Sequence, residues 1–398
     1  MDPISNPYQP SAGVRPRELA GRDRELATMD VLLGRAARGF VSRSLVLTGL
    51  RGVGNTVLLN DFARTARDRG WIVAQIEGPS DYDEAHRPEG ALRAKLARGL
   101  HSSMREALGR WKKSDALRRA AGALKSFTLS LDPSGTWTVG IDVAAATGRA
   151  DTGQVELDLP ELAVDLGGAA RDRGLGVLVC VDEMQQLSGS DLAAICAACH
   201  EAGQREVPFY VAGAGLPNLP GVLADAKSYA ERLFDYSRLD PLSPEAASRA
   251  LRVPAEEQGV QWRKNALEAA VEASGSYPFF LQTFGRHIWD AAVGPTYITV
   301  DDARVGGALA AEQLDRGFFQ SRWDRATPYQ RQYLRAMAAD GDGPSASGDV
   351  AHRLGRRLNA IGPVRAELIG KGLVYSPEHG QLAFTVPGMA AFIARLDG

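Results

Sequence analysis

The feature that most constrains the fold is a glycine-rich turn between an apolar run and a helical pattern. The run is Ser44-Leu-Val-Leu-Thr48, and the turn is Gly49-Leu-Arg-Gly-Val-Gly-Asn-Thr56. The turn fits the phosphate-binding pattern G-x-x-x-x-G-K-[ST] at every fixed position but one, because Asn55 stands where the pattern has lysine. Glycines permit a tight loop whose backbone N–H groups point inward near the positive end of a helix dipole. The sequence therefore predicts a phosphate-binding loop without its usual cation.

The elements around this turn have the order that a phosphate-binding loop requires. Val41–Thr48 is predicted as a strand, the turn leads into a helix that reaches about Arg69, and Trp71–Ile76 is a second short strand. This order is that of a parallel α/β unit. We therefore predict an α/β core, and we expect the loop to consist of Gly49, Leu50, Arg51, Gly52, Val53, Gly54, Asn55, Thr56 and Val57.

A second apolar run ends in two acidic residues. Gly176–Val181 is predicted to be a buried parallel strand, and Asp182 and Glu183 follow it. Paired acids at such a position suit metal-assisted phosphoryl transfer. Asp182, with the hydroxyl group of Thr56, would hold Mg²⁺, and Glu183 would polarise the attacking water. In the alternative interpretation, both acids only cap the helix that follows.

The segment between Leu92 and Lys125 is helical and basic, with ten Lys or Arg residues against two acids, an excess of +8. Such runs are usually solvated helix faces, and nucleic-acid contact is the alternative. Alternating apolar residues from Phe127 to Val143, around the turn Asp132-Pro-Ser-Gly135, predict a β-hairpin. We expect residues 108–155 to be an insertion into a core domain that covers residues 1–240.

The chain becomes helical after Pro241. Ser243 suits an N-cap and Pro244 a first helical position, and helices are predicted at about 244–258, 262–274, 277–293 and 298–320. We expect a helical lid over 241–320.

Residues 321–398 are predicted to form a winged helix-turn-helix, because three helices precede two short strands, Leu373–Ser376 and Leu382–Val386. From 327 to 398 eight basic residues face six acidic ones, so the excess is only +2. The wing domain therefore either contacts DNA or packs on its own core or on a partner protein. The residues expected at a DNA contact are Arg353, Arg356, Arg357, Arg365 and Lys371.

Composition places few limits on function. A net charge of −2 and a hydrophobic content of 44% are ordinary for a globular protein. The N-terminus lacks the features of a signal peptide, and no apolar run approaches the ~20 residues of a membrane helix, so we expect a cytoplasmic protein without membrane contact. Cys196-Ala-Ala-Cys199-His200 matches a haem-attachment pattern, but we expect buried thiols on an ordinary helix.

The order of these motifs resembles the AAA+ superfamily, and within it the STAND-type and initiator-like P-loop ATPases with a C-terminal winged helix. The resemblance rests on Gly21-Arg22, the Gly49–Thr56 loop, Asp182-Glu183, a lid with Gly275-Ser-Tyr-Pro278, and the terminal domain. Gly49-Leu-Arg-Gly-Val-Gly and Gly213-Ala-Gly-Leu-Pro are also similar to stretches of bacterial ATP-binding AAA-family proteins.

This resemblance implies ATP or ADP with Mg²⁺ between core and lid, with Gly21, Arg22 and Pro278 flanking the adenine. Lids of the STAND type use such a proline where other relatives use a sensor arginine, for which Arg286 is the nearest alternative. Relatives sense the γ-phosphate with a polar residue after the strand that corresponds to Pro208–Ala212. Here that strand end is Gly213-Ala-Gly215, so the sensor is weak or absent. Arg232 is either an arginine finger of a homo-oligomer or a surface arginine.

Two functions follow as hypotheses. The first is an AAA+/STAND-like nucleotide switch whose winged helix contacts DNA or a partner protein, with hydrolysis impaired by Asn55. The second is a pseudo-ATPase adaptor or DNA-binding regulatory module with a non-hydrolysing core. Whether the chain is an active ATPase stays open at this point, because asparagine can donate a hydrogen bond but brings no charge.

Overall fold

The computed structural model describes residues 1–79, 91–111, 114–129 and 143–396. The chain forms two compact units. Unit 1 comprises Met1–Asp23, Gly49–Val57 and Leu239–Gly398, and unit 2 comprises Arg24–Thr48 and Leu58–Arg238. Among the described residues no helix is both long and apolar enough to span a membrane.

Unit 2 is built on a five-stranded sheet in the order β2-β3-β4-β1-β5, and all neighbouring strands are parallel. The three central strands are almost entirely buried, as expected for a sheet covered on both faces. The predicted α/β core is therefore confirmed. The strands are β1 (Ser44–Thr48), β2 (Ile72–Glu77), β3 (Val177–Asp182), β4 (Phe209–Gly215) and β5 (Phe234–Arg238).

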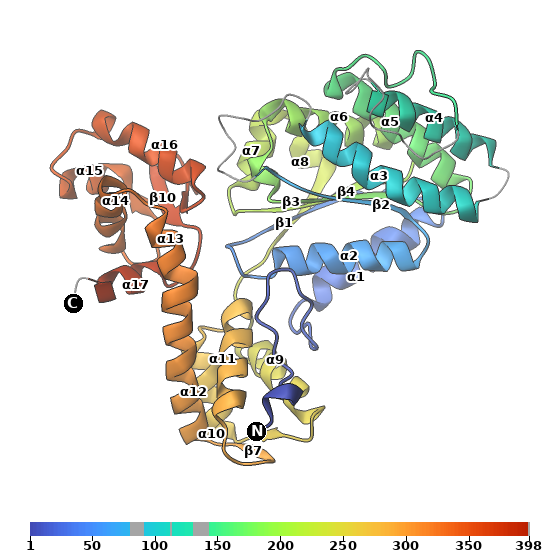
Figure 1. Ribbon diagram of the computed structural model, residues 1–398. Coiled ribbons are helices and arrows are strands. Elements are labelled where there is room, and N and C mark those ends of the chain that lie inside the picture. Colours follow the sequence, from blue (N-terminus) through green and yellow to red (C-terminus); the bar gives the residue numbers. More distant parts are fainter. Residues whose placement is uncertain (80–90, 112–113, 130–142, 397–398) are drawn as a thin grey trace. The chain divides into compact units, whose positions relative to one another are not determined.

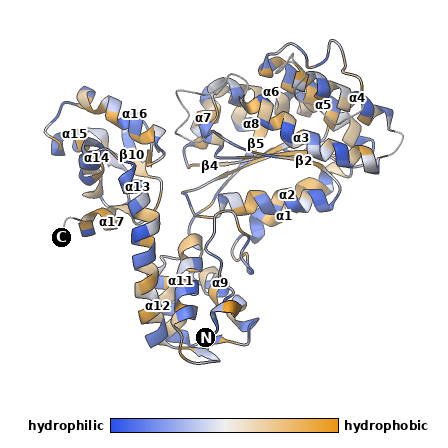
Figure 2. Ribbon diagram, in the orientation of Figure 1, coloured by the Kyte–Doolittle hydropathy of each residue, from blue (hydrophilic) through white to orange (hydrophobic). Residues whose placement is uncertain are grey.

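Helices cover both faces of this sheet. Figure 1 shows α1 (Asp23–Ala36) and α2 (Asn55–Asp68) on one face, and α3, α5 and α6 on the other. The central strands β1, β3 and β4 carry mostly apolar residues and lie between these helices (Figure 2). The remaining helices of this unit are α3 (Ala91–Arg110), α4 (Asp115–Leu129), α5 (Val155–Arg171), η3 (Met184–Gln186), α6 (Gly189–Gln204), α7 (Leu219–Ala226) and α8 (Ala230–Leu233).

The prediction of a β-hairpin is wrong at its start. Phe127 and Leu129 belong to the helix α4, and the rest of the predicted hairpin up to residue 142 lies outside the described residues. Leu117, Ala120, Leu124 and Phe127 are buried with helical spacing, so the period that governs this segment is 3.6. Because α4 packs within the same apolar core as the strands, this segment contributes to the core.

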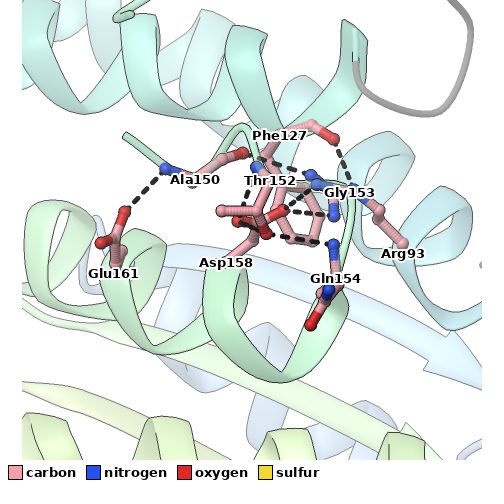
Figure 3. A network of polar contacts seen from close by, with 8 residues as sticks. All are labelled: Arg93, Phe127, Ala150, Thr152, Gly153, Gln154, Asp158 and Glu161. Atoms are coloured by element: carbon pink, nitrogen blue, oxygen red, sulfur yellow. Dashed lines mark hydrogen bonds and ion pairs between the residues drawn. The ribbon is translucent and has the colours of Figure 1, made fainter. Parts of the chain in front are cut away.

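A buried ion pair joins α3 to α5 in the same unit (Figure 3). The guanidinium group of Arg93 is 1% exposed and donates to Asp158, which is 0% exposed, over 2.5 Å. It also donates to the carbonyl groups of Phe127 and Ala150, and Asp158 accepts the backbone N–H groups of Thr152 and Gly153. Arg93 is thus a structural residue and no part of a basic surface.

The helical part of unit 1 begins with α9 (Pro244–Glu256), which Ser243 caps as predicted. It continues with α10 (Lys264–Ala273), α11 (Pro278–Ala291) and α12 (Val300–Gln313), and a two-stranded pair, β6 (Gln261–Trp262) and β7 (Tyr297–Ile298), closes it. The N-terminal segment, with η1 (Pro3–Ser5), packs on these helices, because the hydroxyl group of Tyr8 donates to Leu251 and accepts from Trp262. Burial raises the pKa of Tyr8.

A π-helical turn, η4 (Leu314–Phe319), joins α12 to α13 (Gln320–Asp324). The C-terminal part follows with helices α14 (Pro328–Ala338), α15 (Ser347–Arg353), η5 (Leu358–Ile361), α16 (Gly362–Gly370) and α17 (Met389–Leu396). Its antiparallel sheet has the order β8-β10-β9. The predicted strands appear as β9 (Val374–Tyr375) and β10 (Gln381–Phe384), and β8 (Ser345–Ala346) is a further strand that was not predicted.

Candidate functional site

The glycine loop needs its glycines for conformation and for space. Gly52 and Gly54 have φ angles of +91° and +109°, which side chains with a Cβ rarely adopt. At Gly49 a Cβ atom would lie 2.7 Å from the carbonyl oxygen of Leu239. The loop is therefore a tight turn that requires glycine at these positions, and α2 begins at Asn55, so that its N-terminal N–H groups face the loop.

Asn55 binds the loop itself. Its amide Nδ2 donates to the carbonyl oxygen of Gly49 over 3.2 Å. A lysine at this position would instead extend a charged amine toward a phosphate. The side chain of Asn55 thus takes on a structural role in the turn.

Arg22 contacts the loop from the N-terminal segment, and Gly21 packs against Ala246 of α9. The guanidinium group of Arg22 is buried and donates to the carbonyl oxygens of Val53 (3.0 Å) and Asp240 (2.9 Å). Gly21 has a φ angle of +68°, and a Cβ atom there would lie 2.8 Å from the side chain of Ala246. The structure thus brings Arg22 to the loop and places Gly21 beside Ala246.

Pro278 opens α11, and both of its neighbours contact the loop. The hydroxyl group of Tyr277 donates to the carbonyl oxygen of Arg51 over 2.8 Å, and the N–H group of Phe279 donates to that of Gly52 over 3.2 Å. A Cβ atom on Gly52 would lie 3.1 Å from the Tyr277 ring. The sequence analysis missed Tyr277 and Phe279, although their position next to Pro278 was a usable signal.

The C-terminal part of unit 1 also reaches the loop. The N–H group of Arg51 donates to the carbonyl oxygen of Thr385 over 2.9 Å. Thr385 is fully buried and follows β10, and its hydroxyl group donates to Gly372. The sequence contains no signal for this contact, because it joins positions more than 300 residues apart.

Asp182 and Glu183 belong to unit 2 and stand where β3 ends. Asp182 accepts the N–H group of Glu183 over 2.9 Å. Glu183 has a φ angle of +46°, a left-handed conformation that is strained for a side chain with a Cβ and that clusters at functional sites. Since the carboxyl ends of parallel strands share one edge, Thr48 and Asp182 end at the same edge of the sheet.

Gln185 is a further residue that sequence reasoning missed. Its amide Nε2 donates to the carboxylate of Glu183 over 2.6 Å, and its Oε1 accepts the N–H group of Leu216 over 3.2 Å. A Cβ atom on Gly213 would lie 2.5 Å from the sulfur of Met184, and one on Gly215 would overlap Gln185. The end of β4 is glycine-rich because η3 packs against it.

Asn218, the first polar side chain after β4, has a buried Oδ1 atom without a hydrogen-bond partner among the described residues. Its amide group is therefore available to a polar ligand.

The remaining predicted site residues lie on several elements. Arg232 is exposed on α8. Of the residues predicted to contact DNA, Arg356 and Arg357 are exposed, whereas Arg353 pairs with Asp340. Arg365 donates to Ser376, and Lys371 donates to Arg325 and Gln330. Among the described residues, Arg356 and Arg357 are thus the two of these five whose exposed side chains make no such ion pair or hydrogen bond.

The three cysteines are free, buried thiols, as predicted. Burial raises the pKa of Cys196 to about 11 and that of Cys199 to about 12, so neither thiol is a thiolate at neutral pH. No cluster of His, Cys, Asp and Glu suited to a metal ion occurs in the part of the chain that the structure describes.

Two family models match parts of this chain. Residues 18–211 match the model of the AAA ATPase domain family. This stretch of the chain is therefore similar to the AAA ATPase domain. Residues 316–393 match a second model, described as a domain of unknown function (DUF8462). No curated protein matches the chain.

Similar folds occur among solved structures. The Walker-type ATPase of Pyrococcus abyssi matches with a TM-score of 0.57 and 15% identity, over 96% of this chain and 97% of that one. The RuvB Holliday junction branch migration motor of Thermotoga maritima matches with a TM-score of 0.44 and 14% identity, over 93% and 95%. Cdc6p of Pyrobaculum aerophilum has a TM-score of 0.45 at 14% identity, over 100% and 98%. The first similarity shows the shared α/β P-loop fold.

Proposed function

We propose that the protein is an AAA+/STAND-like nucleotide switch that binds ATP or ADP with Mg²⁺ at the glycine loop. The observation that carries this proposal is the pair of contacts on the loop within unit 1. The lid donates hydrogen bonds to the carbonyl groups of Arg51 and Gly52, and the backbone of Arg51 donates to Thr385 of the C-terminal part. A phosphate that reorients the loop would change both sets of contacts.

The residues present fit a nucleotide phosphate. Gly52 and Gly54 have no Cβ atoms that would crowd a phosphate, and the N-terminus of α2 directs N–H groups toward the loop. Mg²⁺, when bound with the nucleotide, supplies charge stabilisation to the phosphates. We propose that Thr56 and Asp182 hold it, that Glu183 orients water, and that Gly21, Arg22 and Pro278 flank the base.

We propose slow hydrolysis for two reasons. Asn55 brings no charge to the phosphates, and its amide is bound to Gly49. The carboxylate of Glu183 is bound to Gln185, and this hydrogen bond weakens Glu183 as a base. A nucleotide then persists long enough to set the conformation of the lid and the C-terminal part.

We further propose that residues 321–398 are a winged helix that contacts DNA or a partner protein, because their helices precede an antiparallel wing. The exposed groups of Arg356 and Arg357 are the best supported contacts. Arg232 stays a proposed arginine finger, should the protein form a homo-oligomer.

Titration calorimetry with ATP and Mg²⁺ separates this switch from the alternative, a pseudo-ATPase adaptor with an empty core. We expect the natural chain to bind and Asn55→Lys to bind more tightly, because lysine adds a charge-assisted contact. If Asn55→Lys binds ATP and the natural chain gives no heat of binding, the proposed switch is contradicted and the adaptor is supported.

A mobility-shift assay with duplex DNA at two salt concentrations tests the wing domain. If DNA is the partner, replacing both Arg356 and Arg357 with alanine lowers the affinity and reduces its salt dependence. Arg353→Ala is the matched control, because Arg353 already pairs with Asp340. An unchanged shift in the double variant would assign DNA to another face.

A further inference from the structure

Although the loop lacks its lysine, two arginines of unit 1 lie at it, and a third packs against residues that contact it. Arg22 donates to the loop carbonyl of Val53, Arg51 belongs to the loop, and Arg322 lies on α13. The hydroxyl group of Tyr277 donates to the carbonyl oxygen of Arg51. Burial raises the pKa of Tyr277, and the charges of Arg22 and Arg322 oppose that shift.

Arg322 lines a cavity of about 380 Å³, a volume that suits a small ligand. The cavity lies between α11 and the π-helical turn η4, a kind of turn that often occurs at functional sites. Its lining residues among those described include two arginines and a histidine but no carboxylate. They are Pro10, Phe279, Thr283, Arg286, His287, Gln313, Leu314, Gly317, Phe318 and Arg322.

Packing connects Arg322 to the glycine loop. Its guanidinium group lies 3.9 Å from the centre of the Phe318 ring, and its Nη1 donates to the Phe318 carbonyl oxygen. The Phe318 ring stacks on Phe279 with ring centres 5.2 Å apart. Phe279 in turn donates its N–H group to Gly52.

The charges around Arg322 favour the binding of an anion. In the described ranges no carboxylate lies within ion-pair distance of Arg322. Burial lowers the pKa of Arg322 to about 10, and repulsion by Arg51 and Arg325 adds to the shift. A partly buried cation among other cations costs free energy that a bound anion recovers.

We propose that Arg322, together with Arg51, supplies to the nucleotide phosphates the positive charge that Asn55 does not. The inference rests on the proposed function and names its ligand class, a nucleoside di- or triphosphate. Arg322 lies on α13, directly before the C-terminal part and within the stretch that matches DUF8462. The guanidinium group proposed to bind the phosphates thus belongs to the stretch that matches DUF8462.

Calorimetry with ADP and with AMP tests this role in the full chain. We expect Arg322→Met to weaken ADP binding at least about tenfold, the scale of one charged hydrogen bond, and to leave AMP binding nearly unchanged. Adding Asn55→Lys to Arg322→Met is expected to restore ADP binding. Arg304→Met is the matched control, because Arg304 is 77% exposed on α12. Without nucleotide, Arg322→Met is expected to unfold at the same or a higher temperature, since it removes a repelled cation.

Two results overturn the inference while nucleotide binding stands. One is ADP binding by Arg322→Met equal to that of the control. The other is a lowered unfolding temperature with equal losses for ADP and AMP and no rescue by Asn55→Lys, which would give Arg322 a structural role. If neither the natural chain nor Asn55→Lys binds ADP or ATP, the proposed function itself fails, and the inference fails with it.

Discussion

Asp158→Ala is expected to destabilise unit 2 by about 3–5 kcal/mol. The substitution leaves the guanidinium group of Arg93 buried at 1% exposure without its carboxylate. It also removes the acceptor for the backbone N–H groups of Thr152 and Gly153. Burial lowers the pKa of Arg93, and Asp158 opposes that shift. Without Asp158, the attraction of that carboxylate no longer offsets the desolvation free energy of the guanidinium group.

Hydrogen exchange of amides in α3, α4 and α5 is the suitable measurement, because it reports on this unit separately from unit 1. Asp165→Ala on the same helix is the matched control, since Asp165 pairs with a 44% exposed Arg149 and should cost less than about 1 kcal/mol. Replacing both partners, as Arg93→Met with Asp158→Leu, should recover much of the loss. A loss for Asp158→Ala no larger than for Asp165→Ala would contradict a structural role for the buried pair.

Asn55→Lys is expected to raise the rate of ATP hydrolysis by roughly 100-fold or more. A lysine at this position follows the phosphoryl group and stabilises the charge that develops in the transition state. Arg322, under the inference above, contributes mainly to binding of the ground state, so the gain should fall on kcat rather than on KM.

Phosphate release in single-turnover experiments measures this effect. Asn55→Gln is the control, because glutamine adds length without charge and should leave the rate near that of the natural chain. Adding Glu183→Gln to Asn55→Lys should remove most of the gain if Glu183 orients the water. Equal rates for Asn55→Lys and Asn55→Gln would show that the missing charge does not limit hydrolysis.

Local signals predicted much of the fold. The strands β1, β2 and β3 follow from short apolar runs, and Ser243 caps α9 where the sequence indicated. The error at Phe127 has a physical cause, since a run in which every second residue is apolar also fits one face of a helix over a few residues. Packing on the core then selected the helix. Likewise, the basic count around Arg93 did not reveal that this side chain is buried against Asp158.

The sequence by itself determined the glycine loop, because the residue types at Gly52 and Gly54 reflect backbone angles that only glycine adopts readily. It also determined that the loop lacks a lysine. Only the tertiary structure decided which groups contact the loop: Tyr277 and Phe279 at the start of α11, and the carbonyl group of Thr385. Such neighbours come from positions more than 200 residues away, and their pairing depends on packing that no local pattern encodes.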